Sequence, residues 1–199
     1  MRLEDYRTLF VVGSLVLILA TAFPGLSVVF SFPKNGETFT ELWVLGPGHM
    51  AEDYPFNVAA GGEYAVYVGV GNHMGASSFY NVRVKCRNQS EPLPNATAGT
   101  PSVLPTYYEE MVFVEDGGTW ETSLNFSFAG VSFSGNHCRV KSVRINGFTF
   151  DMDKTVLWDE ENRGFYYHLF IELWIYWVES DAFEYHNRFV GIWLNMTAV

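Results

Sequence analysis

The sequence is poor in basic residues. It contains 12 lysines and arginines against 22 aspartates and glutamates, and its formal net charge is −10 at pH 7. After Phe32 the imbalance is ten basic against twenty acidic side chains. A nucleic-acid-binding surface is basic, and anionic lipids are recognised by clusters of lysine and arginine. The composition therefore argues against a nucleic-acid partner and gives no sign of a polybasic contact with lipid headgroups.

The sequence also lacks the local motifs of familiar catalytic and metal sites. It has no H-E-x-x-H or G-x-S-x-G, and none of its five histidines are spaced i, i+4. His137-Cys138 and Met152 lack the spacing of a copper site. The acidic stretch Asp151–Glu161 lacks the spacing and central glycine of a calcium loop, and Gly69–Gly75 precedes no helix or lysine that would cradle phosphate. We predict no enzyme activity, no metal and no cofactor.

Cysteine is scarce, with only Cys86 and Cys138 in the chain. Both lie in the part of the sequence that follows the apolar N-terminal run. One pair in such a place is compatible with a single disulfide in an oxidising compartment. We predict a Cys86–Cys138 disulfide, and the alternative is two free, buried thiols.

The N-terminal region contains one long uncharged run, Leu9–Phe32. About 20 apolar residues suffice for a helix to cross a bilayer, so residues 1–32 are predicted to form a cytoplasmic stub and one transmembrane helix. The alternative is a cleavable signal peptide, with Ala20-Thr21-Ala22 as its cleavage site. In the preferred interpretation the chain is a single-pass protein of the cell membrane. Residues 33–199 then form an extracellular domain, and residues 9–32 contact the lipid bilayer.

Four N-x-S/T motifs support an extracellular location. They are at Asn88, Asn95, Asn125 and Asn195. Each motif is weak evidence alone, because such tripeptides arise by chance. Four of them in this domain exceed the chance expectation somewhat, and we predict N-linked glycans at these asparagines.

Alternation of apolar and polar residues predicts that residues 33–199 are mainly β. Strands are expected at Tyr80–Arg87, Trp120–Phe128, Phe189–Thr197, Phe39–Leu45, Glu63–Gly71, Glu109–Glu115 and Arg139–Asn146. Short strands separated by regular turns indicate a sandwich or a barrel, and we predict an immunoglobulin-like β-sandwich. The stretch 91–105 has four prolines and is predicted to be an exposed loop. In this pattern Cys86 points inward, whereas Asn125 and Asn195 point outward.

The insertion 158–181 contains an aromatic segment that fits no strand pattern. Phe165–Val178 has seven aromatic residues in fourteen and a single acidic one. Its length favours a short helix, and a helix with no polar face must be covered by something. We predict that it contacts a partner subunit or lipid, and the alternative is burial against this protein's own sheet. The predicted interaction surface comprises Phe165, Tyr166, Tyr167, Phe170, Trp174, Tyr176 and Trp177.

The stretch from Leu45 to His73 is interpreted as the entry corner of the sandwich rather than as an active-site loop. Its motifs are Leu45-Gly46-Pro47, Tyr54-Pro55, Gly62, Val68-Gly69-Val70 and Asn72-His73, and Tyr80 begins the next strand. This progression resembles the extracytoplasmic domain of an uncharacterised archaeal membrane-protein family, a domain of unknown function. Met74 stands where that family has an acid. The resemblance implies transmembrane segments, an immunoglobulin-like sandwich and no assigned activity.

These observations predict a non-enzymatic, membrane-anchored, glycosylated surface protein that acts by protein–protein contact. Its partners would be other membrane or envelope proteins, and its role that of an accessory subunit. Two alternatives remain open. One is a pilin-like filament subunit, which also joins an apolar N-terminal helix to a β-domain. The other is a carbohydrate-binding ectodomain that uses surface tryptophans.

Overall fold

The computed structural model describes residues 6–7, 10–18 and 37–198. It separates into two compact units, Met1–Glu37 and Thr38–Val199. In the first unit residues 6–7 and 10–18 are helical, and the described residues include no helix long and apolar enough to span a membrane. Most of the predicted transmembrane segment 9–32, and the predicted cleavage site at residues 20–22, lie outside the described residues.

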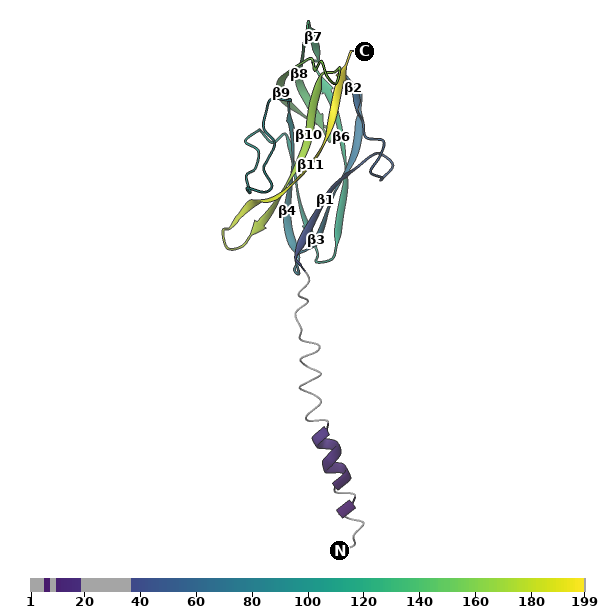
Figure 1. Cartoon of the computed structure of the whole chain (residues 1–199), viewed down its shortest axis with the longest axis vertical. Coiled ribbons are helices and arrows are strands. Elements are labelled where there is room, and N and C mark those ends of the chain that lie inside the picture. The colour runs from purple at the N-terminus through teal and green to yellow at the C-terminus, as the bar shows by residue number, and fades with distance from the viewer. Residues whose placement is uncertain (1–5, 8–9, 19–36, 199) are drawn as a thin grey trace. The chain divides into compact units, whose positions relative to one another are not determined.

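The second unit is a sandwich of two β-sheets (Figure 1). Sheet A has the order β1 (Phe39–Leu45), β3 (Tyr64–His73), β6 (Thr119–Ala129) and β8 (His137–Ile145); β7 (Ser132–Ser134) and β9 (Phe148–Leu157) both pair with β8. Sheet B has the order β2 (Asn57–Ala59), β11 (Ala182–Thr197), β10 (Tyr166–Trp177), β4 (Ser78–Arg87) and β5 (Tyr108–Val114). The β2–β11 pair is parallel and the other named strand pairs are antiparallel.

The predicted mainly-β sandwich is confirmed, and all seven predicted strands are present. The connectivity is immunoglobulin-like in sheet B, where two late strands lie beside two early ones. In sheet A, β1, β3, β6 and β8 follow one another in chain order, whereas immunoglobulin domains reverse the last two strands of the corresponding sheet. The β9 strand was not predicted, although every second residue from Met152 to Val156 is buried.

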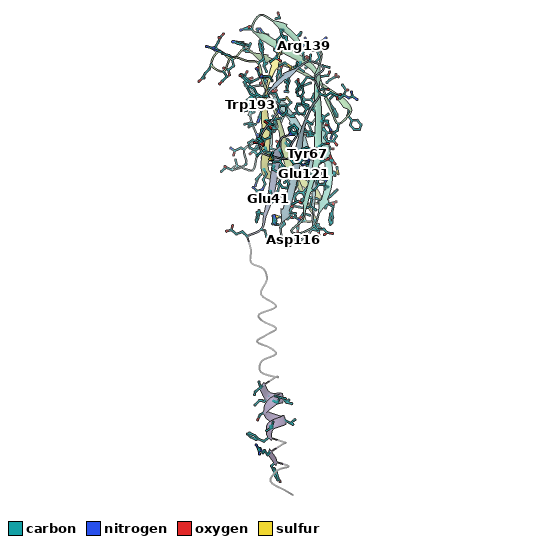
Figure 2. The ribbon with its side chains drawn as sticks, turned by 90° about the vertical axis from the view of Figure 1, so that its right-hand side faces the viewer. Glu41, Tyr67, Asp116, Glu121, Arg139 and Trp193 are labelled. Atoms are coloured by element: carbon teal, nitrogen blue, oxygen red, sulfur yellow. The ribbon has the colours of Figure 1, made fainter. Side chains whose placement is uncertain are left out.

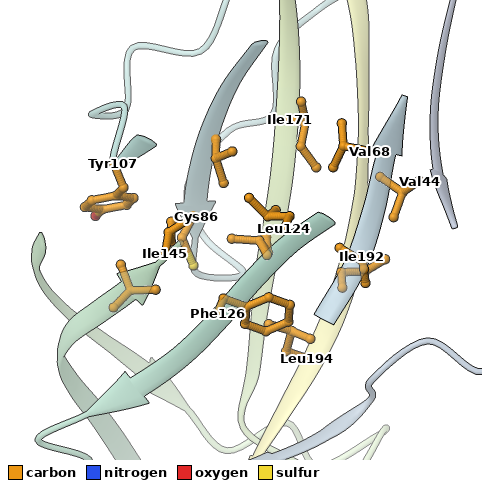
Figure 3. Packing of buried hydrophobic residues seen from close by; sticks show 14 of the residues in the cluster. Val44, Val68, Cys86, Tyr107, Leu124, Phe126, Ile145, Ile171, Ile192 and Leu194 are labelled. Carbon is orange, nitrogen blue, oxygen red and sulfur yellow. The ribbon is translucent and has the colours of Figure 1, made fainter. Parts of the chain in front are cut away.

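The core lies between the sheets, where inward side chains of both interdigitate (Figure 3). The contributors from sheet A include Val68, Leu124 and Phe126, and those from sheet B include Ile171, Ile192 and Leu194. Each is almost fully buried. Burying a side chain of this kind contributes about 1.5–3 kcal/mol. The burial of these alternating apolar side chains is therefore the main source of the fold's stability.

The aromatic segment Phe165–Val178 is a strand, β10, and the predicted helix is wrong. The strand lies in the middle of sheet B, paired with both β11 and β4. Its inward residues pack in the core, and its outward residues His168, Phe170 and Glu172 are also buried. A strand that is covered on both faces shows a continuous apolar run instead of alternation. The spacing of apolar residues in this segment therefore did not identify it as a strand.

The proline-rich stretch 91–105 is a loop with mostly exposed residues, as predicted, and it also contacts the outer face of β10. It contains no named strand, and we call it the excursion loop. The backbone N–H of Ser102 donates to Glu172 Oε1 at 2.7 Å. Pro94 and Ser102 are buried. The loop reverses between Asn95 and Thr100, whose backbones exchange hydrogen bonds of 2.8 and 2.9 Å.

The predicted disulfide is absent, because Cys86 and Cys138 are both free and buried. Cys86 lies on β4 of sheet B, and Cys138 lies on β8 of sheet A. Immunoglobulin domains do join their facing sheets by a disulfide, so a place on opposite sheets does not by itself prevent a bridge. Here the Tyr167 side chain crosses from sheet B, and its hydroxyl donates to the Cys138 carbonyl oxygen at 2.9 Å. Burial raises the pKa of Cys86 to about 12 and that of Cys138 to about 11.

The glycines of the Leu45–His73 stretch provide room for close contacts. A Cβ on Gly46 would lie 1.8 Å from the backbone oxygen of Glu52, so only glycine fits this corner. A Cβ on Gly69 would lie 2.1 Å from the Trp43 ring, which packs across β3. These two positions therefore shape the backbone and its packing.

Asn72, in the same stretch, connects three parts of the fold. Its Nδ2 donates to the carbonyl oxygens of Ala76 and Val114, each at 2.9 Å. Its Oδ1 accepts from the Tyr80 hydroxyl at 2.9 Å. The side chain is fully buried, and it secures the turn between β3 and β4 to the end of β5. The prediction of a structural corner agrees with this geometry.

Candidate functional site

The outer face of sheet B, on the side away from the core, has three zones along its strands. The excursion loop covers the middle. Beyond it, the β10–β11 hairpin projects from the sandwich at one end (Figure 1). At the other end, where β4 finishes and β10 begins, an aromatic cleft opens. Outward residues in these zones come from four neighbouring strands, β5, β4, β10 and β11.

A buried ion pair holds the middle zone together. Lys85 Nζ lies 3.0 Å from Glu172 Oε2, and both side chains are buried. The Lys85 ammonium also donates to the Ser102 carbonyl oxygen at 2.7 Å, and Trp174 Nε1 donates to Glu172 Oε2 at 3.1 Å. The ammonium of Lys85 on β4 and the carboxylate of Glu172 on β10 therefore both bind the backbone of Ser102 and attach the excursion loop to these two strands.

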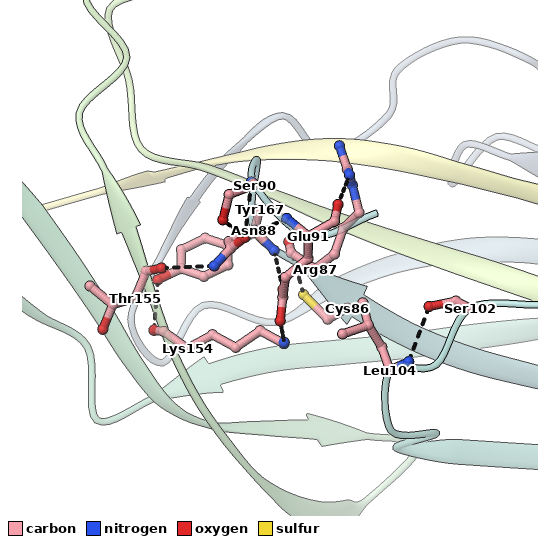
Figure 4. A network of polar contacts seen from close by, with 10 residues as sticks. All are labelled: Cys86, Arg87, Asn88, Ser90, Glu91, Ser102, Leu104, Lys154, Thr155 and Tyr167. Atoms are coloured by element: carbon pink, nitrogen blue, oxygen red, sulfur yellow. Dashed lines mark hydrogen bonds and ion pairs between the residues drawn. The ribbon is translucent and has the colours of Figure 1, made fainter. Parts of the chain in front are cut away.

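A second polar cluster fixes the start of the excursion loop (Figure 4). Lys154 Nζ on β9 lies 2.5 Å from Glu91 Oε1, and Glu91 Oε2 accepts from the backbone N–H of Asn88 at 2.8 Å. The Arg87 guanidinium donates to the Glu91 carbonyl oxygen. The loop is thus attached to both sheets, because β9 belongs to sheet A and β4 to sheet B.

The projecting end of sheet B presents an apolar patch to solvent. The patch comprises Phe79, Met111, Phe113, Tyr176 and Phe183, and we call it the hairpin patch. Met111 and Phe113 on the edge strand β5 are 53% and 64% exposed. Phe79 on β4 lies 5.3 Å from Phe183, between ring centroids, and Tyr176 lies 5.5 Å from the same ring. Phe113 is paired with Phe79 in the register of β4 and β5, so the exposed side chains of β5 lie beside the three rings, of which Tyr176 and Phe183 are half-buried.

Exposed acidic side chains surround the hairpin patch. Glu109 and Glu115 are on or beside β5, and Glu179, Asp181 and Glu184 belong to the hairpin. The Tyr176 hydroxyl donates to Asp181. Glu109 lies 3.5 Å from Arg83 Nε, so the negative charge of the rim comes chiefly from Glu115 and from the three acidic residues of the hairpin.

The predicted interaction surface is mostly internal. Of its seven residues, Tyr167 and Phe170 are fully buried and Tyr166 nearly so. Phe165 and Trp174 are half-buried, and the Trp174 ring is covered by the Arg83 guanidinium at 4.0 Å. Tyr176 and Trp177 alone reach the projecting hairpin. The alternative of burial against this protein's own sheet is the correct one for most of the segment.

The aromatic cleft has a volume of 310 Å³ and is lined by Phe56, Gln89, Asp159, Asn162, Tyr166 and Trp193. These residues come from the loop before β2, the end of β4, the β9–β10 turn, β10 and β11. Trp193, labelled in Figure 2, stacks on His168 with 4.6 Å between ring centroids. Burial and the charge of Arg87 lower the pKa of His168 to about 4, so this imidazole is neutral at pH 7.

Sheet A presents a different polar group on its outer face. The Glu121 carboxylate accepts from Trp43 Nε1 at 2.9 Å and lies 2.7 Å from His49 Nδ1. The His49 ring stacks on Tyr67, with 3.6 Å between centroids; Figure 2 labels Tyr67 and Glu121. The hydrogen bond from Trp43, with that of His49, lowers the pKa of Glu121. This contact secures the β1–β2 loop to the sheet, in agreement with its interpretation as a corner.

The remaining histidines are dispersed. His73 stacks on Phe39, and His186 Nε2 lies 2.8 Å from the Thr40 hydroxyl, while His137 is exposed at the start of β8. Within residues 6–7, 10–18 and 37–198, no group of three or more histidine, cysteine, aspartate or glutamate residues is placed to hold a metal ion.

The four predicted glycosylation sites differ in geometry. Asn95 and Asn125 are exposed, whereas Asn88 and Asn195 are half-buried. Asn88 Nδ2 donates to the Thr155 carbonyl oxygen at 3.2 Å, and Asn195 Nδ2 donates to Asn57 Oδ1 at 2.9 Å. Asn125 Nδ2 also donates, to Ser123 Oγ at 3.2 Å, although its side chain is exposed. The two pairs therefore differ in the exposure of the asparagine that would carry the glycan.

We expect glycans at Asn95 and Asn125, and little or none at Asn88 and Asn195, when the folded chain is the acceptor. Glycopeptide mass spectrometry of the protein from its native host measures the occupancy of each site. A high occupancy of Asn195 would contradict this assignment, because it requires the hydrogen bond to Asn57 to break.

The model of one known protein family matches more than half of the chain. Residues 33–141 match the model of the family described as "Domain of unknown function (DUF1616)". The chain belongs to the DUF1616 family. The DUF1616 match includes β1 to β7 and part of β8, so Met111 and Phe113 lie within it, whereas the β10–β11 hairpin and Trp193 lie beyond it. The predicted resemblance to a domain of unknown function is thus confirmed.

No curated protein matches the chain. Among solved structures, a β-glucosidase from Listeria innocua in complex with gluconolactone is similar at 9% identity and a TM-score of 0.42. That alignment covers 80% of this chain and 16% of the β-glucosidase, so the chain spans about a sixth of that enzyme's length. The CARDB domain of the PF1109 protein from Pyrococcus furiosus, in complex with di-metal ions, is similar at 10% identity and a TM-score of 0.39. Here the alignment covers 80% of this chain and 89% of that domain.

Proposed function

We propose that this chain is a non-enzymatic β-sandwich that acts by protein–protein contact through the hairpin patch. The observation that carries the proposal is the exposure of Met111 and Phe113 beside a cluster of three aromatic rings. Aromatic residues and methionine are enriched at protein interfaces. Exposed apolar surface of this kind marks sites of interaction.

The position of the patch on an edge strand supports the same conclusion. β5 is the last strand of sheet B and pairs with β4 alone. An edge strand with exposed apolar side chains is prone to unwanted association unless it is protected. Here the acidic residues Glu109 and Glu115 flank the apolar pair. They keep like-charged copies of the chain apart while leaving the patch open to another protein.

The charge of the rim defines the partner. A surface that complements the patch has an apolar centre and a basic periphery, since opposite charges steer encounter and exclude wrong partners. We propose that this partner is another protein of a membrane or envelope assembly, of which this chain is a glycosylated accessory subunit. The uncharged run Leu9–Phe32 would anchor the chain beside it. The composition of that run and the exposed sequons at Asn95 and Asn125 support this part of the proposal.

A photo-crosslinking residue placed at position 113 of the full chain, in the native host, tests the contact. Phe148 on β9 provides the matched control, because it has the same exposed fraction of 64% but lies on sheet A. We expect a defined crosslinked partner from position 113 that position 148 does not give.

With that partner purified, Phe113→Glu is expected to weaken binding at least about tenfold, as truncation of a central aromatic does at a typical interface. Phe148→Glu should leave the affinity unchanged, and higher salt should lower the association rate. Equal losses from both variants, or identical crosslinks from both positions, would rule out the hairpin patch as the contact.

A further inference from the structure

The aromatic cleft has rigid ring surfaces. Trp193 is 40% exposed, yet its ring is stacked on His168 and lies 5.2 Å from the guanidinium carbon of Arg87. Tyr166 is fixed by its hydroxyl, which donates to the Asn162 carbonyl oxygen at 2.6 Å. Its ring centroid lies 6.0 Å from that of Phe56. Rings that are immobilised before a ligand arrives lose little entropy on binding.

Planar polar groups lie beside these rings. Asp159 Oδ2 accepts from Gln89 Nε2 at 3.2 Å and from Asn162 Nδ2 at 3.0 Å. Asp159 Oδ1 accepts from the backbone N–H groups of Glu161 and Asn162. Within the described part of the chain, Gln89 Oε1 and Asn162 Oδ1 make no hydrogen bond, so both remain as acceptors at the cleft. A primary amide also retains a second N–H donor.

The charge of the lining selects against anions. Asp159 is the one charged residue among the six that line the cleft, and none of them is lysine or arginine. The hydrogen bonds from Asn162 lower the pKa of Asp159, which keeps it ionised at neutral pH. A phosphate, sulfate or carboxylate would meet a like charge here. A purely apolar ligand would leave the amides of Gln89 and Asn162 without partners, which is costly.

A ligand that suits the cleft is neutral, has an apolar face for the rings and carries hydroxyls at its edge. A pyranose ring has this form, because its axial C–H groups are weakly positive and the face of an aromatic ring is negative. The volume of 310 Å³ is near the lower end of the roughly 300–1,000 Å³ found for ligand sites. The cleft therefore suits a short saccharide segment.

We propose that the aromatic cleft binds a neutral pyranose oligosaccharide, with Trp193 as the stacking surface and Gln89 and Asn162 as hydrogen-bonding groups. The site is separate from the hairpin patch, because β4 has Phe79 near one end and Arg87, next to the cleft, at the other. Saccharide binding and protein contact can therefore be lost independently, and the failure of one proposal leaves the other standing.

The test uses the full chain produced in a host that adds no N-linked glycans, and in a buffer free of glycoside detergent, whose headgroup is itself a neutral saccharide. Maltotetraose, cellotetraose and mannotriose are the neutral probes, and a sulfated heparin tetrasaccharide is the acidic one. Binding is followed by the NMR shift of the Trp193 indole N–H and by calorimetry. We expect saturable binding of at least one neutral probe, with a Kd of about 10 μM to 1 mM.

Trp193→Ala should weaken that binding at least tenfold. Trp177→Ala is the matched control, since Trp177 is 38% exposed but belongs to the hairpin, and it should bind as the unchanged protein does. If Trp193→Ala does not fold, Gln89→Ala decides the question and should weaken binding severalfold. The proposal is wrong if no neutral probe binds at up to about 10 mM, if the heparin fragment binds more tightly than every neutral probe, or if the substitution that decides the test leaves the affinity intact.

Discussion

Replacing Glu172 with alanine is expected to lower the free energy of unfolding by about 3–5 kcal/mol. The substitution leaves the Lys85 ammonium buried without its counterion, which lay 3.0 Å away. It also removes the acceptor of the Ser102 N–H and of Trp174 Nε1. Because a domain of this size is stable by only about 5–15 kcal/mol, the loss is a large share of the total. Guanidinium unfolding followed by circular dichroism measures it.

Two controls separate the ion pair from general effects of substitution. Glu63→Ala removes an exposed carboxylate that makes no ion pair in the described part of the chain, and it should change stability by less than about 0.5 kcal/mol. The double substitution Lys85→Met/Glu172→Met removes both charges and should cost much less than Glu172→Ala, since apolar replacements of buried pairs are often neutral or stabilising. A loss of less than about 1 kcal/mol from Glu172→Ala would show that the excursion loop is not held by this contact.

The ion pair matters for function because the excursion loop divides the outer face of sheet B. With the loop in place, Phe170 and Glu172 on the outer face of β10 are buried between the hairpin patch and the aromatic cleft. Without it, the middle of β10 would be exposed as well. Limited proteolysis within residues 91–105 should therefore increase in the Glu172→Ala protein, because a detached loop is accessible to proteases.

Strands that have one face in the core and the other face outward could be predicted from the sequence. The strand β10, which is buried on both faces, could not. In β4, buried Val82 and Val84 alternate with residues that face away from the core, so period-2 alternation identified the strand. The outward face of β10 is covered by a loop that comes from 70 residues earlier in the chain, as the Ser102–Glu172 contact shows. No local pattern contains that information. The same limit applies to the ion pair between Lys154 and Glu91, which are distant in sequence.

The residues of the two candidate sites, the aromatic cleft and the hairpin patch, could likewise be predicted only in part from the sequence. Trp193 stands between the apolar residues Ile192 and Leu194, so alternation predicts that it faces outward, and it is 40% exposed while its two neighbours are buried. The other residues of the aromatic cleft come from four separate segments, among them Gln89 and Asp159, which meet only because β4 and the β9–β10 turn end at the same edge of the sandwich. Similarly, Phe113 and Phe183 carry no shared signal in the sequence. The topology of sheet B, in which β4 lies between β5 and β10, brings them to one surface.

The stability of the sandwich is expected to fall as the pH drops from about 6.5 to about 4. Burial and the neighbouring Arg87 lower the pKa of His168 to about 4 in the folded chain, whereas the unfolded value is about 6.5. Between these values the unfolded state binds more protons than the folded state, so stability rises with pH across this window and is lost as the pH falls. Burial lowers the pKa of His186 as well, which adds to the effect in the same direction.

His168→Phe isolates the contribution of this ring. Phenylalanine retains the stacking on Trp193 and has no proton to bind, so its free energy of unfolding should lack the His168 term, which amounts to roughly 2–3 kcal/mol between pH 6.5 and 4. The measurement is the difference in unfolding free energy between the two proteins at several pH values, which cancels the titration of the carboxylates. A difference that does not change with pH would mean that His168 is as easily protonated in the fold as in water. In that case Arg87 and the buried imidazole could not lie together beneath the aromatic cleft in the arrangement described.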